Sequence, residues 1–171
     1  MKIENIITDR LNIRGFQKED ALFAFSICND PEMGQYLTDA SNGKTDEEYL
    51  RILEGLGDDD ECCYLIAELK ETHERIGTCS FIPSEDGEIY DIAYCVHKKY
   101  WRNGYATEMI KGMIKHAKSN GAKKITVKID EDNEASNGVV NKLGFHVAKK
   151  GTYIRQGTHS EAVDLLYELN I

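Results

Sequence analysis

The segment from Glu88 to Ile129 constrains the fold of this chain more than any other part of the sequence. A strand candidate at Glu88–Val96 precedes a long helical stretch at Gly104–Ser119, and a second strand candidate follows at Lys124–Ile129. In the helical stretch, apolar residues recur at i, i+3, i+4, i+7, i+8 and i+11, namely Ala106, Met109, Ile110, Met113, Ile114 and Ala117. Such a stripe is typical of a helix that covers a sheet. Two strands joined through a helix are expected to be parallel, with a right-handed crossover.

Six to seven strands and about four helices are expected along the chain. Apolar runs predict strands at Leu11–Arg14, Cys63–Leu69, Arg75–Ile82, Glu88–Val96, Lys124–Ile129, Phe145–Lys149 and Ala162–Leu169. Helices are predicted at Lys18–Cys28, after the capping box Thr45–Glu48, at Gly104–Ser119 and at Ser136–Leu143. Short polar turns join the second to fourth strands, which therefore read as an antiparallel meander. The pattern predicts one α+β domain, residues 1–171, built on a mixed, mostly antiparallel sheet.

The two early helices are expected to bury one face each. In the first, Leu22, Phe25 and Cys28 lie roughly on a common face. The second carries Tyr49, Ile52, Leu53 and Leu56.

Length and composition are those of an ordinary globular domain. The chain has 171 residues, of which 41% are apolar and 30% charged. No apolar run approaches the roughly 18 residues that cross a bilayer, and the N-terminus lacks the apolar core of a signal peptide, so a cytoplasmic protein without a membrane partner is expected. The five cysteines are odd in number and lack zinc-binding spacing. Reduced, mostly buried thiols and no bound metal are therefore expected.

The charge balance bears on partners. Lys and Arg total 21 against 30 Asp and Glu, a formal net charge of −9. Such a surface repels nucleic acid backbones, so no nucleic acid partner is expected. It would attract a cationic amine or a basic peptide.

The turn at 102–107 carries the clearest chemical signal. It reads RNGYAT, a glycine and small residues directly after a strand and at the start of a helix. The first amides of a helix lack partners within the helix and the dipole adds positive potential, so this turn is suited to bind a phosphate-bearing cofactor. The alternative is a plain helix start with glycine in a turn. The chain contains neither G-x-x-x-x-G-K-[ST] nor G-x-G-x-x-G, which argues against a nucleotide triphosphatase and a dinucleotide-binding fold.

Three separated segments resemble the GCN5-related N-acetyltransferases (GNAT). Residues 96–108 read VHKKYWRNGYATE and are similar to the family's central motif, Q/R-x-x-G-x-G/A after a strand, with Trp101 where Gln or Arg is usual. The tryptophan and the following GYATE are similar to the Rim-type branch, which acetylates ribosomal-protein N-termini. The segments TDRLNIR at 8–14 and NEASNGVVNKLGF at 133–145 agree with that branch. The resemblance thus spans nearly the whole chain.

The resemblance implies a site for acetyl-CoA in a V-shaped cleft between the strands at Glu88–Val96 and Lys124–Ile129. The backbone of Tyr94, Cys95 and Val96 would bind the pantetheine arm like an added strand. The pyrophosphate would lie on the loop and helix start formed by Trp101, Arg102, Asn103, Gly104, Tyr105, Ala106 and Thr107.

The resemblance also implies direct attack of an amine on the thioester, which needs a base and an acid. Asp91 is the leading base, acting through water, because DIAY at 91–94 matches the family pattern Glu-Ile-Gly-Tyr; the alternative is an exposed strand carboxylate that only attracts the amine. Glu88 is the second choice. Ser136 is the candidate acid, or it caps its helix. The tyrosine that acts as acid in many relatives has no clear counterpart, although Tyr94 lies nearby.

Other residues of these segments have both functional and structural interpretations. Asn133 would bind the pantetheine amide or order a water, or it is a turn residue. Lys142 would reach the 3′-phosphate, or it is a solvated helix lysine. His97 is expected at the surface and not as a base, and Gly144-Phe145 is expected to be structural.

Two functions remain open at this level, an N-acetyltransferase acting on a protein N-terminus or a small amine, and an acetyl-CoA-binding module or regulator without catalysis. A third, weaker alternative is a cytosolic scaffold. The acceptor is expected to meet residues 33–57 and 150–160, where Asp39, Asp46, Glu47 and residues 58–61 would form an acidic mouth or ordinary loop charge. A homodimer is the expected assembly by analogy with relatives.

Overall fold

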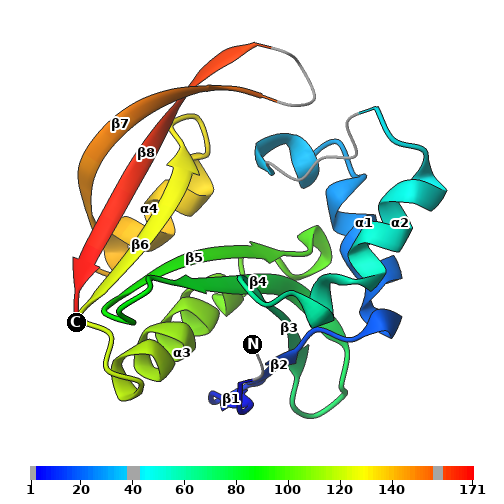
Figure 1. The fold of residues 1–171 in the computed structure, drawn as a ribbon, viewed down its shortest axis with the longest axis horizontal. Coiled ribbons are helices and arrows are strands. Elements are labelled where there is room, and N and C mark those ends of the chain that lie inside the picture. The colour runs from blue at the N-terminus through cyan, green and yellow to red at the C-terminus, as the bar shows by residue number, and fades with distance from the viewer. Residues whose placement is uncertain (1–2, 38–42, 156–159) are drawn as a thin grey trace.

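The computed structural model describes residues 3–37, 43–155 and 160–171, and these form one α+β domain around a mixed sheet (Figure 1). Within these residues the sheet has eight strands in the order β1-β2-β3-β4-β5-β6-β8-β7. In chain order the strands are β1 (Ile6–Ile7), β2 (Leu11–Gly15), β3 (Cys63–Leu69), β4 (Arg75–Pro83), β5 (Ile89–Val96), β6 (Lys124–Asp130), β7 (His146–Ile154) and β8 (Glu161–Asn170). All neighbours are antiparallel except β5 and β6. The predicted meander and the parallel crossover are confirmed.

Four α-helices flank the sheet in the described residues: α1 (Ala21–Cys28), α2 (Asp46–Glu54), α3 (Tyr105–Ser119) and α4 (Glu134–Lys142). Short 3₁₀ turns lie at Lys18–Asp20, Gly34–Tyr36, Leu56–Asp58 and Lys98–Tyr100. The capping box at the start of α2 is present, because the Thr45 hydroxyl accepts from the Glu48 amide and the Glu48 carboxylate accepts from the Thr45 amide. In this part of the chain no helix is long and apolar enough to cross a membrane.

The parallel pair β5 and β6 is short, and this shapes the molecule. Its partners run only from Ile89 with Lys124 to Asp91 with Thr126. Beyond Asp91 the two strands diverge, because β6 continues by pairing with β8 while β5 stays paired with β4. Figure 1 shows this V, with β5 in green and β6 in yellow separating from a common base.

The helices cover opposite faces of the sheet. One core contains the α3 stripe (Met109, Ile110, Met113 and Ala117) packed on side chains of β2 to β6. A smaller core joins α1 and α2 to the other face, through Ala24, Tyr49, Leu53 and Ile66. Alternation along each strand sends successive side chains to these two cores.

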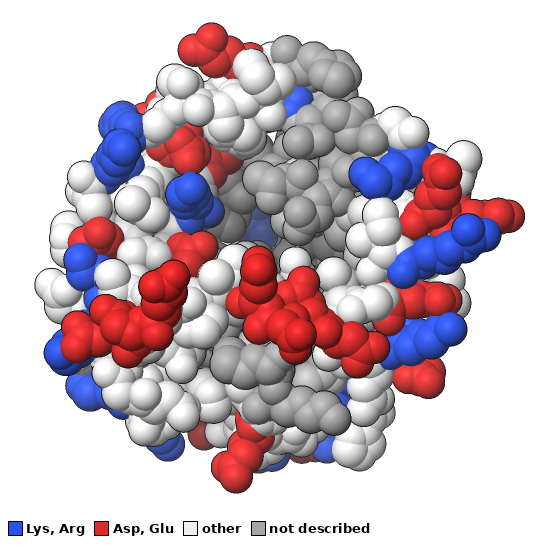
Figure 2. All heavy atoms as spheres, viewed as in Figure 1, with Lys and Arg blue, Asp and Glu red and all other residues white. Residues whose placement is uncertain are grey.

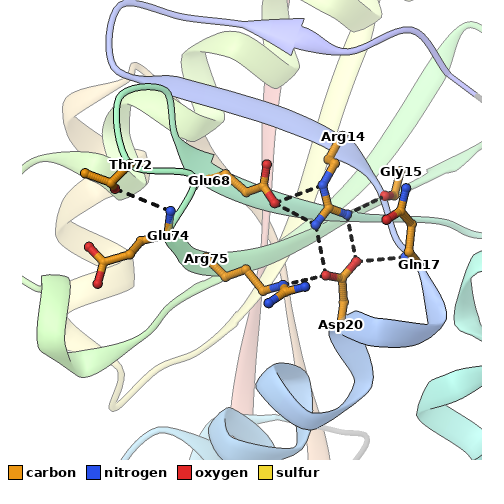
Figure 3. A network of polar contacts seen from close by, with 8 residues as sticks. All are labelled: Arg14, Gly15, Gln17, Asp20, Glu68, Thr72, Glu74 and Arg75. Atoms are coloured by element: carbon orange, nitrogen blue, oxygen red, sulfur yellow. Dashed lines mark hydrogen bonds and ion pairs between the residues drawn. The ribbon is translucent and has the colours of Figure 1, made fainter.

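The expected apolar face of α1 is only partly confirmed, because Phe25 and Cys28 are partly buried against the smaller core but Leu22 is not. Leu22 is 70% exposed, while Ala21, Ala24 and Ile27 are buried. A 3₁₀ turn precedes α1 and ends at Asp20, whose fully buried carboxylate binds Arg14 and Arg75 (Figure 3). Because Asp20, Ala24 and Ile27 lie at i, i+4 and i+7, this buried ion cluster sets which face of the helix meets the sheet.

The other differences from the predicted elements concern the number of strands and where β7 and α4 begin or end. The strand count is eight and not six to seven, because the two-residue strand β1 has too few residues for a periodic signal. The edge strand β7 extends to Ile154, well beyond the expected Lys149, and most of its side chains are exposed. Helix α4 begins at Glu134 and not at Ser136, with Asn133 as its N-cap.

Candidate active site

The loop before α3 has the backbone geometry of an anion site. Gly104 is the N-cap with φ of 78°, and Arg102 also has a left-handed φ, of 61°. The first amide bonded within the helix is that of Glu108, which donates to the Gly104 carbonyl at 3.1 Å. The amides of Tyr105, Ala106 and Thr107 therefore point out of the helix start without intrahelical acceptors. Left-handed residues that turn successive amides to one side form an anion-binding concavity.

Side chains from the N-terminal segment hold this loop. The Arg10 guanidinium donates to the Asn103 carbonyl at 3.0 Å and to Glu108 Oε2 at 2.7 Å, and it lies 4.4 Å from the Tyr105 ring centroid. The Thr8 hydroxyl donates to Glu108 Oε1 at 2.6 Å. The segment TDR at 8–10 and the motif GYATE at 104–108 thus form one structural unit.

Trp101 fixes the other end of the loop. Its indole N–H donates to the Val96 carbonyl at 2.6 Å, although 42% of the residue is exposed. The Asn103 side-chain amide donates to the carbonyls of Tyr100 and Trp101 at 3.1 and 3.0 Å. Because side chains satisfy these carbonyls, the loop presents mainly amides outward.

The register of β5 decides which main-chain groups face the V. Two main-chain hydrogen bonds join the ends of β5 to the β4 side. The His97 amide donates to the Ile76 carbonyl, and the Ser84 amide donates to the Ile89 carbonyl. Hydrogen-bonded pairs alternate along an antiparallel ladder, so Asp91, Ala93 and Cys95 point their main-chain groups at β4. Those of Tyr94 and Val96 point into the V. By this alternation the main-chain groups of Cys95 are directed at β4, so its register does not support the expected backbone contact with the donor, which stays a prediction.

Asp91 lies at the apex of the V. It is the last residue of β5 paired with β6, and the Thr126 hydroxyl donates to its carboxylate at 2.6 Å. Burial raises the pKa of Asp91 above its usual value, although the bond from Thr126 opposes this. Its side chain is on the same face of β5 as those of Ala93 and Cys95, because side chains alternate along a strand.

Tyr94 bridges the two arms of the V. Its hydroxyl donates to the Ser136 carbonyl on α4 at 3.4 Å, and burial raises its pKa to about 12. Ser136 does not cap α4; the Asn133 side chain does, accepting from the Ser136 amide at 3.1 Å. Among the described residues the Ser136 hydroxyl makes no hydrogen bond. The structure therefore brings Tyr94, Asn133 and Ser136 together at the opening of the V.

A pocket of about 480 Å³ lies between β5 and the helices α1 and α2, on the face of the sheet that these two helices cover. Its lining includes Tyr49, Ile52 and Leu53 of α2 and the β5 residues Ala93, Tyr94 and Cys95. Burial raises the pKa of Cys95 to about 12 and that of Cys79, also in the lining, further still, so both thiols are protonated at neutral pH.

Several residues considered from the sequence lie away from the V, among them His97, which was not expected in the site. Glu88 precedes β5 and pairs with Lys123 on the surface. His97 stacks on Phe23 beside a separate shallow pocket, away from the V. Lys142 ends α4, whereas Asn133 precedes its first residue, so the two lie at opposite ends of that helix. Asp39 lies outside the described residues.

The comparisons with known proteins decide the family. Residues 10–146 match the family described as the acetyltransferase (GNAT) domain, which covers well over half of the chain. The protein belongs to the GNAT N-acetyltransferases. The resemblance found in the sequence is thereby confirmed.

Known relatives agree along most of the chain. The uncharacterized protein YkkB of Bacillus subtilis is 28% identical over 152 residues, 84% of this chain and 86% of that protein. The uncharacterized N-acetyltransferase p20 of Bacillus licheniformis is 28% identical over 151 residues, 84% and 83% of the two chains. Among solved structures, a RimL ribosomal L7/L12 α-N-protein acetyltransferase in complex with coenzyme A has a TM-score of 0.80 at 17% identity and covers 98% of both chains. At that identity the likeness concerns the fold.

The residues of this GNAT protein fit a coenzyme A donor. A negative pyrophosphate matches the outward amides of residues 105–107. Among the described residues, a Cβ at Gly104 would meet only the Arg10 guanidinium, 3.6 Å away, so the space beside the loop is open. An extended pantetheine arm matches the main-chain groups of Tyr94 and Val96 that face the V. In the described residues no group of three or more His, Cys, Asp and Glu side chains could hold a metal ion.

Sequence reasoning missed two parts of the site. The support of the loop by Arg10 joins residues 98 positions apart, and only the family resemblance of segment 8–14 drew attention to it. The pocket is assembled from helices α1 and α2 and strands β3 to β5, and no local pattern signals such an assembly.

Proposed function

We propose that this GNAT protein transfers an acetyl group from acetyl-CoA to a primary amine by direct attack of the amine on the thioester. The observation that carries the proposal is the position of residues 93–95 of β5. The main chain of Tyr94 faces the V in which the donor arm fits, and Ala93, Tyr94 and Cys95 also line the pocket on the other side. One short stretch of strand would thus border both substrates, which supports a close approach of the amine to the thioester.

The donor would be held by main-chain groups. Amides at the start of α3 bind the pyrophosphate, and the Tyr94 and Val96 groups bind the pantetheine arm. The Val96 carbonyl already accepts a hydrogen bond from the Trp101 indole N–H, and its second lone pair can accept one from an amide N–H of the pantetheine arm. Coenzyme A supplies an activated acyl carbon and a thiolate leaving group.

Proton transfer is assigned to Asp91 and the groups around Ser136. The amine nitrogen forms a bond to the acyl carbon while the carbon–sulfur bond breaks, so one proton leaves nitrogen and one is needed on sulfur. Asp91 lies two residues before Ala93 on the same strand face, roughly 6.6 Å away along the strand, so it receives the proton through water. Ser136, whose hydroxyl has no partner among the described residues, donates to the sulfur, and Tyr94 is the second candidate.

The competing function is binding of acetyl-CoA without catalysis. The experiment measures thiol release from acetyl-CoA with a panel of peptides and small amines, together with calorimetry of coenzyme A binding. Amine-dependent thiol release and acetylated product in equal amounts support the transferase. Binding without turnover of any amine overturns it in favour of a binding module, and failure to bind coenzyme A overturns both.

A further inference from the structure

The walls of the pocket on the α1–α2 side are apolar. Helix α2 contributes Tyr49, Ile52 and Leu53, and Phe16 and Leu56 extend the surface. The floor consists of small or uncharged residues of β4 and β5. A volume of about 480 Å³ is within the range of sites that enclose small molecules or single side chains.

Acidic groups are absent from the described lining of this pocket. Its one charged residue there is Lys44, a cation, and the thiols of Cys79 and Cys95 are protonated. Asp46, Glu47 and residues 58–61, which the sequence offered as an acidic mouth or ordinary loop charge, lie outside this lining, and Asp39 lies outside the described residues. Figure 2 shows many of the Asp and Glu side chains of this face gathered in two groups across its middle, with most of the Lys and Arg toward its left and right edges.

This lining discriminates between classes of amine. Asp91 lies close to the reacting amine, but a second ammonium group buried in the described lining would have no counter-charge there, which is strongly unfavourable, and the nearby lysine adds repulsion. Polyamines and aminoglycosides carry several such groups. An α-amine has an unperturbed pKa of about 7.7–8.0, against about 10.4 for a lysine side chain, so a substantial fraction is already neutral near pH 7.5.

We infer that the acceptor is an α-amine with an apolar side chain, such as a peptide or amino acid derivative beginning with a large aliphatic or aromatic residue. The inference rests on the proposed function and specifies its acceptor. The side chain occupies the pocket against Tyr49 and Leu53, and the α-amine lies over the β5 segment 93–95. Lys44 accommodates a carboxylate of the acceptor and disfavours a second ammonium group.

The first test compares kcat/KM for dipeptide amides that begin with Leu, Phe or Gly, for spermidine and for an aminoglycoside. These dipeptides have the same reactive α-amine and differ in the side chain. The Leu and Phe peptides are expected to exceed the Gly peptide by roughly ten- to a hundredfold. Higher kcat/KM for spermidine or the aminoglycoside, or equal values for Leu, Phe and Gly, would overturn the inference while leaving the acetyltransferase itself in place.

The second test uses Ile52→Glu with Leu22→Glu as its matched control. Ile52 lines the pocket and is 48% exposed, so the substitution avoids the core, and Leu22 is an exposed apolar residue of the neighbouring helix outside the pocket. Ile52→Glu is expected to lower kcat/KM for the Leu peptide at least about tenfold, to raise the relative rate with spermidine, and to leave coenzyme A binding unchanged. Leu22→Glu should match the wild type.

Two outcomes distinguish a failure of this inference from a failure of the proposed function. Equal behaviour of the two variants would overturn the assignment of the pocket to the acceptor side chain. Coenzyme A binding without turnover of any amine would refute the proposed function and the inference with it. If Ile52→Glu does not fold, as judged by circular dichroism, Ile52→Ser replaces it, with the same expected direction for the Leu peptide.

Discussion

Arg10 and Glu108 are 98 residues apart in the sequence, yet the Arg10 Nε lies 2.7 Å from Glu108 Oε2. The same guanidinium binds the Asn103 carbonyl and lies over the Tyr105 ring. The N-terminal strand region therefore supports the donor loop from behind, while the amides of α3 point outward. A loop held in this way needs little ordering when an anion binds, which favours affinity.

Replacing Arg10 should weaken donor binding. In Arg10→Ala the loop loses two charge-assisted hydrogen bonds, so the Kd for coenzyme A is expected to rise about tenfold, or about 1.4 kcal/mol, with little change in kcat. Isothermal calorimetry measures the Kd. Lys99→Ala is the control, because Lys99 forms an exposed ion pair with Glu74 close to the same loop. Equal Kd values for the two variants would show that Arg10 does not order the site.

Gly104 allows a test with an internal backbone control. Gly104 and Gly87 both have left-handed φ, 78° and 71°, so Ala at either position should cost roughly 1–2 kcal/mol of stability. In Gly104→Ala the added methyl group and the altered loop should also raise the Kd for coenzyme A, by about tenfold or more. Gly87→Ala, in the turn between β4 and β5, should leave that Kd unchanged. Urea unfolding and calorimetry on both variants check this, and similar Kd values would place the pyrophosphate elsewhere.

Local periodicity predicted the elements that are regular and half-buried. The α3 stripe and the bounds of β3 to β6 agree with the sequence because alternation and helical spacing record which side faces a core. The turn at Gly104 was recognisable because helix starts and glycine have known backbone consequences. Family resemblance, and not periodicity, attached a particular donor to that turn.

Long-range pairing produced what the sequence could not predict. The buried face of α1 follows from the contacts of Asp20 with Arg14 and Arg75, and no local pattern distinguishes a buried aspartate from a surface one. The character of the pocket under α1 and α2 likewise depends on side chains from those two helices and three strands. Loop acidity therefore suggested a cationic acceptor, although the described lining of the pocket is apolar.

The role of Asp91 can be tested through its pKa. Burial raises this pKa above the usual value, so the acid limb of kcat/KM due to Asp91 should lie at higher pH than for an exposed aspartate. Asp91→Asn should remove that limb and lower kcat by about a hundredfold. Because the pKa of Asp91 is higher in the folded state than in the unfolded state, the ionised carboxylate disfavours folding. The stability that the protonated carboxyl gives at low pH is therefore lost as pH rises through the folded-state pKa. The variant should thus be at least as stable as the wild type at pH 7.

The control for this experiment is Glu88→Gln, which removes the other candidate base. Glu88 forms a surface ion pair with Lys123, so this variant should retain wild-type kcat and pH dependence. pH profiles of all three proteins are compared after correction for titration of the acceptor amine, which is common to them. A lost limb in Glu88→Gln together with a normal limb in Asp91→Asn would exchange the two assignments.

The cluster around Asp20 should govern acid stability. Its fully buried carboxylate accepts two bonds from Arg14, at 2.7 and 2.9 Å, and one from Arg75 at 2.6 Å (Figure 3). Burial alone would raise the pKa of Asp20, but the bonds from Arg14, the Gln17 amide and Arg75 lower it below its usual range. Asp20→Asn leaves Arg14 without its main counter-charge, so a loss of about 3–5 kcal/mol in unfolding free energy is expected at pH 7.

The pH dependence of that loss identifies its cause. Because the pKa of Asp20 is lower in the folded state than in the unfolded state, its stabilisation is fully present above about pH 5 and disappears as pH falls through about 4 and below. The difference between wild type and Asp20→Asn, measured by urea unfolding from pH 7 to pH 3, should therefore shrink in acid. Asp86→Asn, which changes an exposed turn carboxylate, should stay near wild-type stability at pH 7. A difference that stays constant with pH would assign the effect of Asp20→Asn to packing and hydrogen-bond geometry rather than to charge.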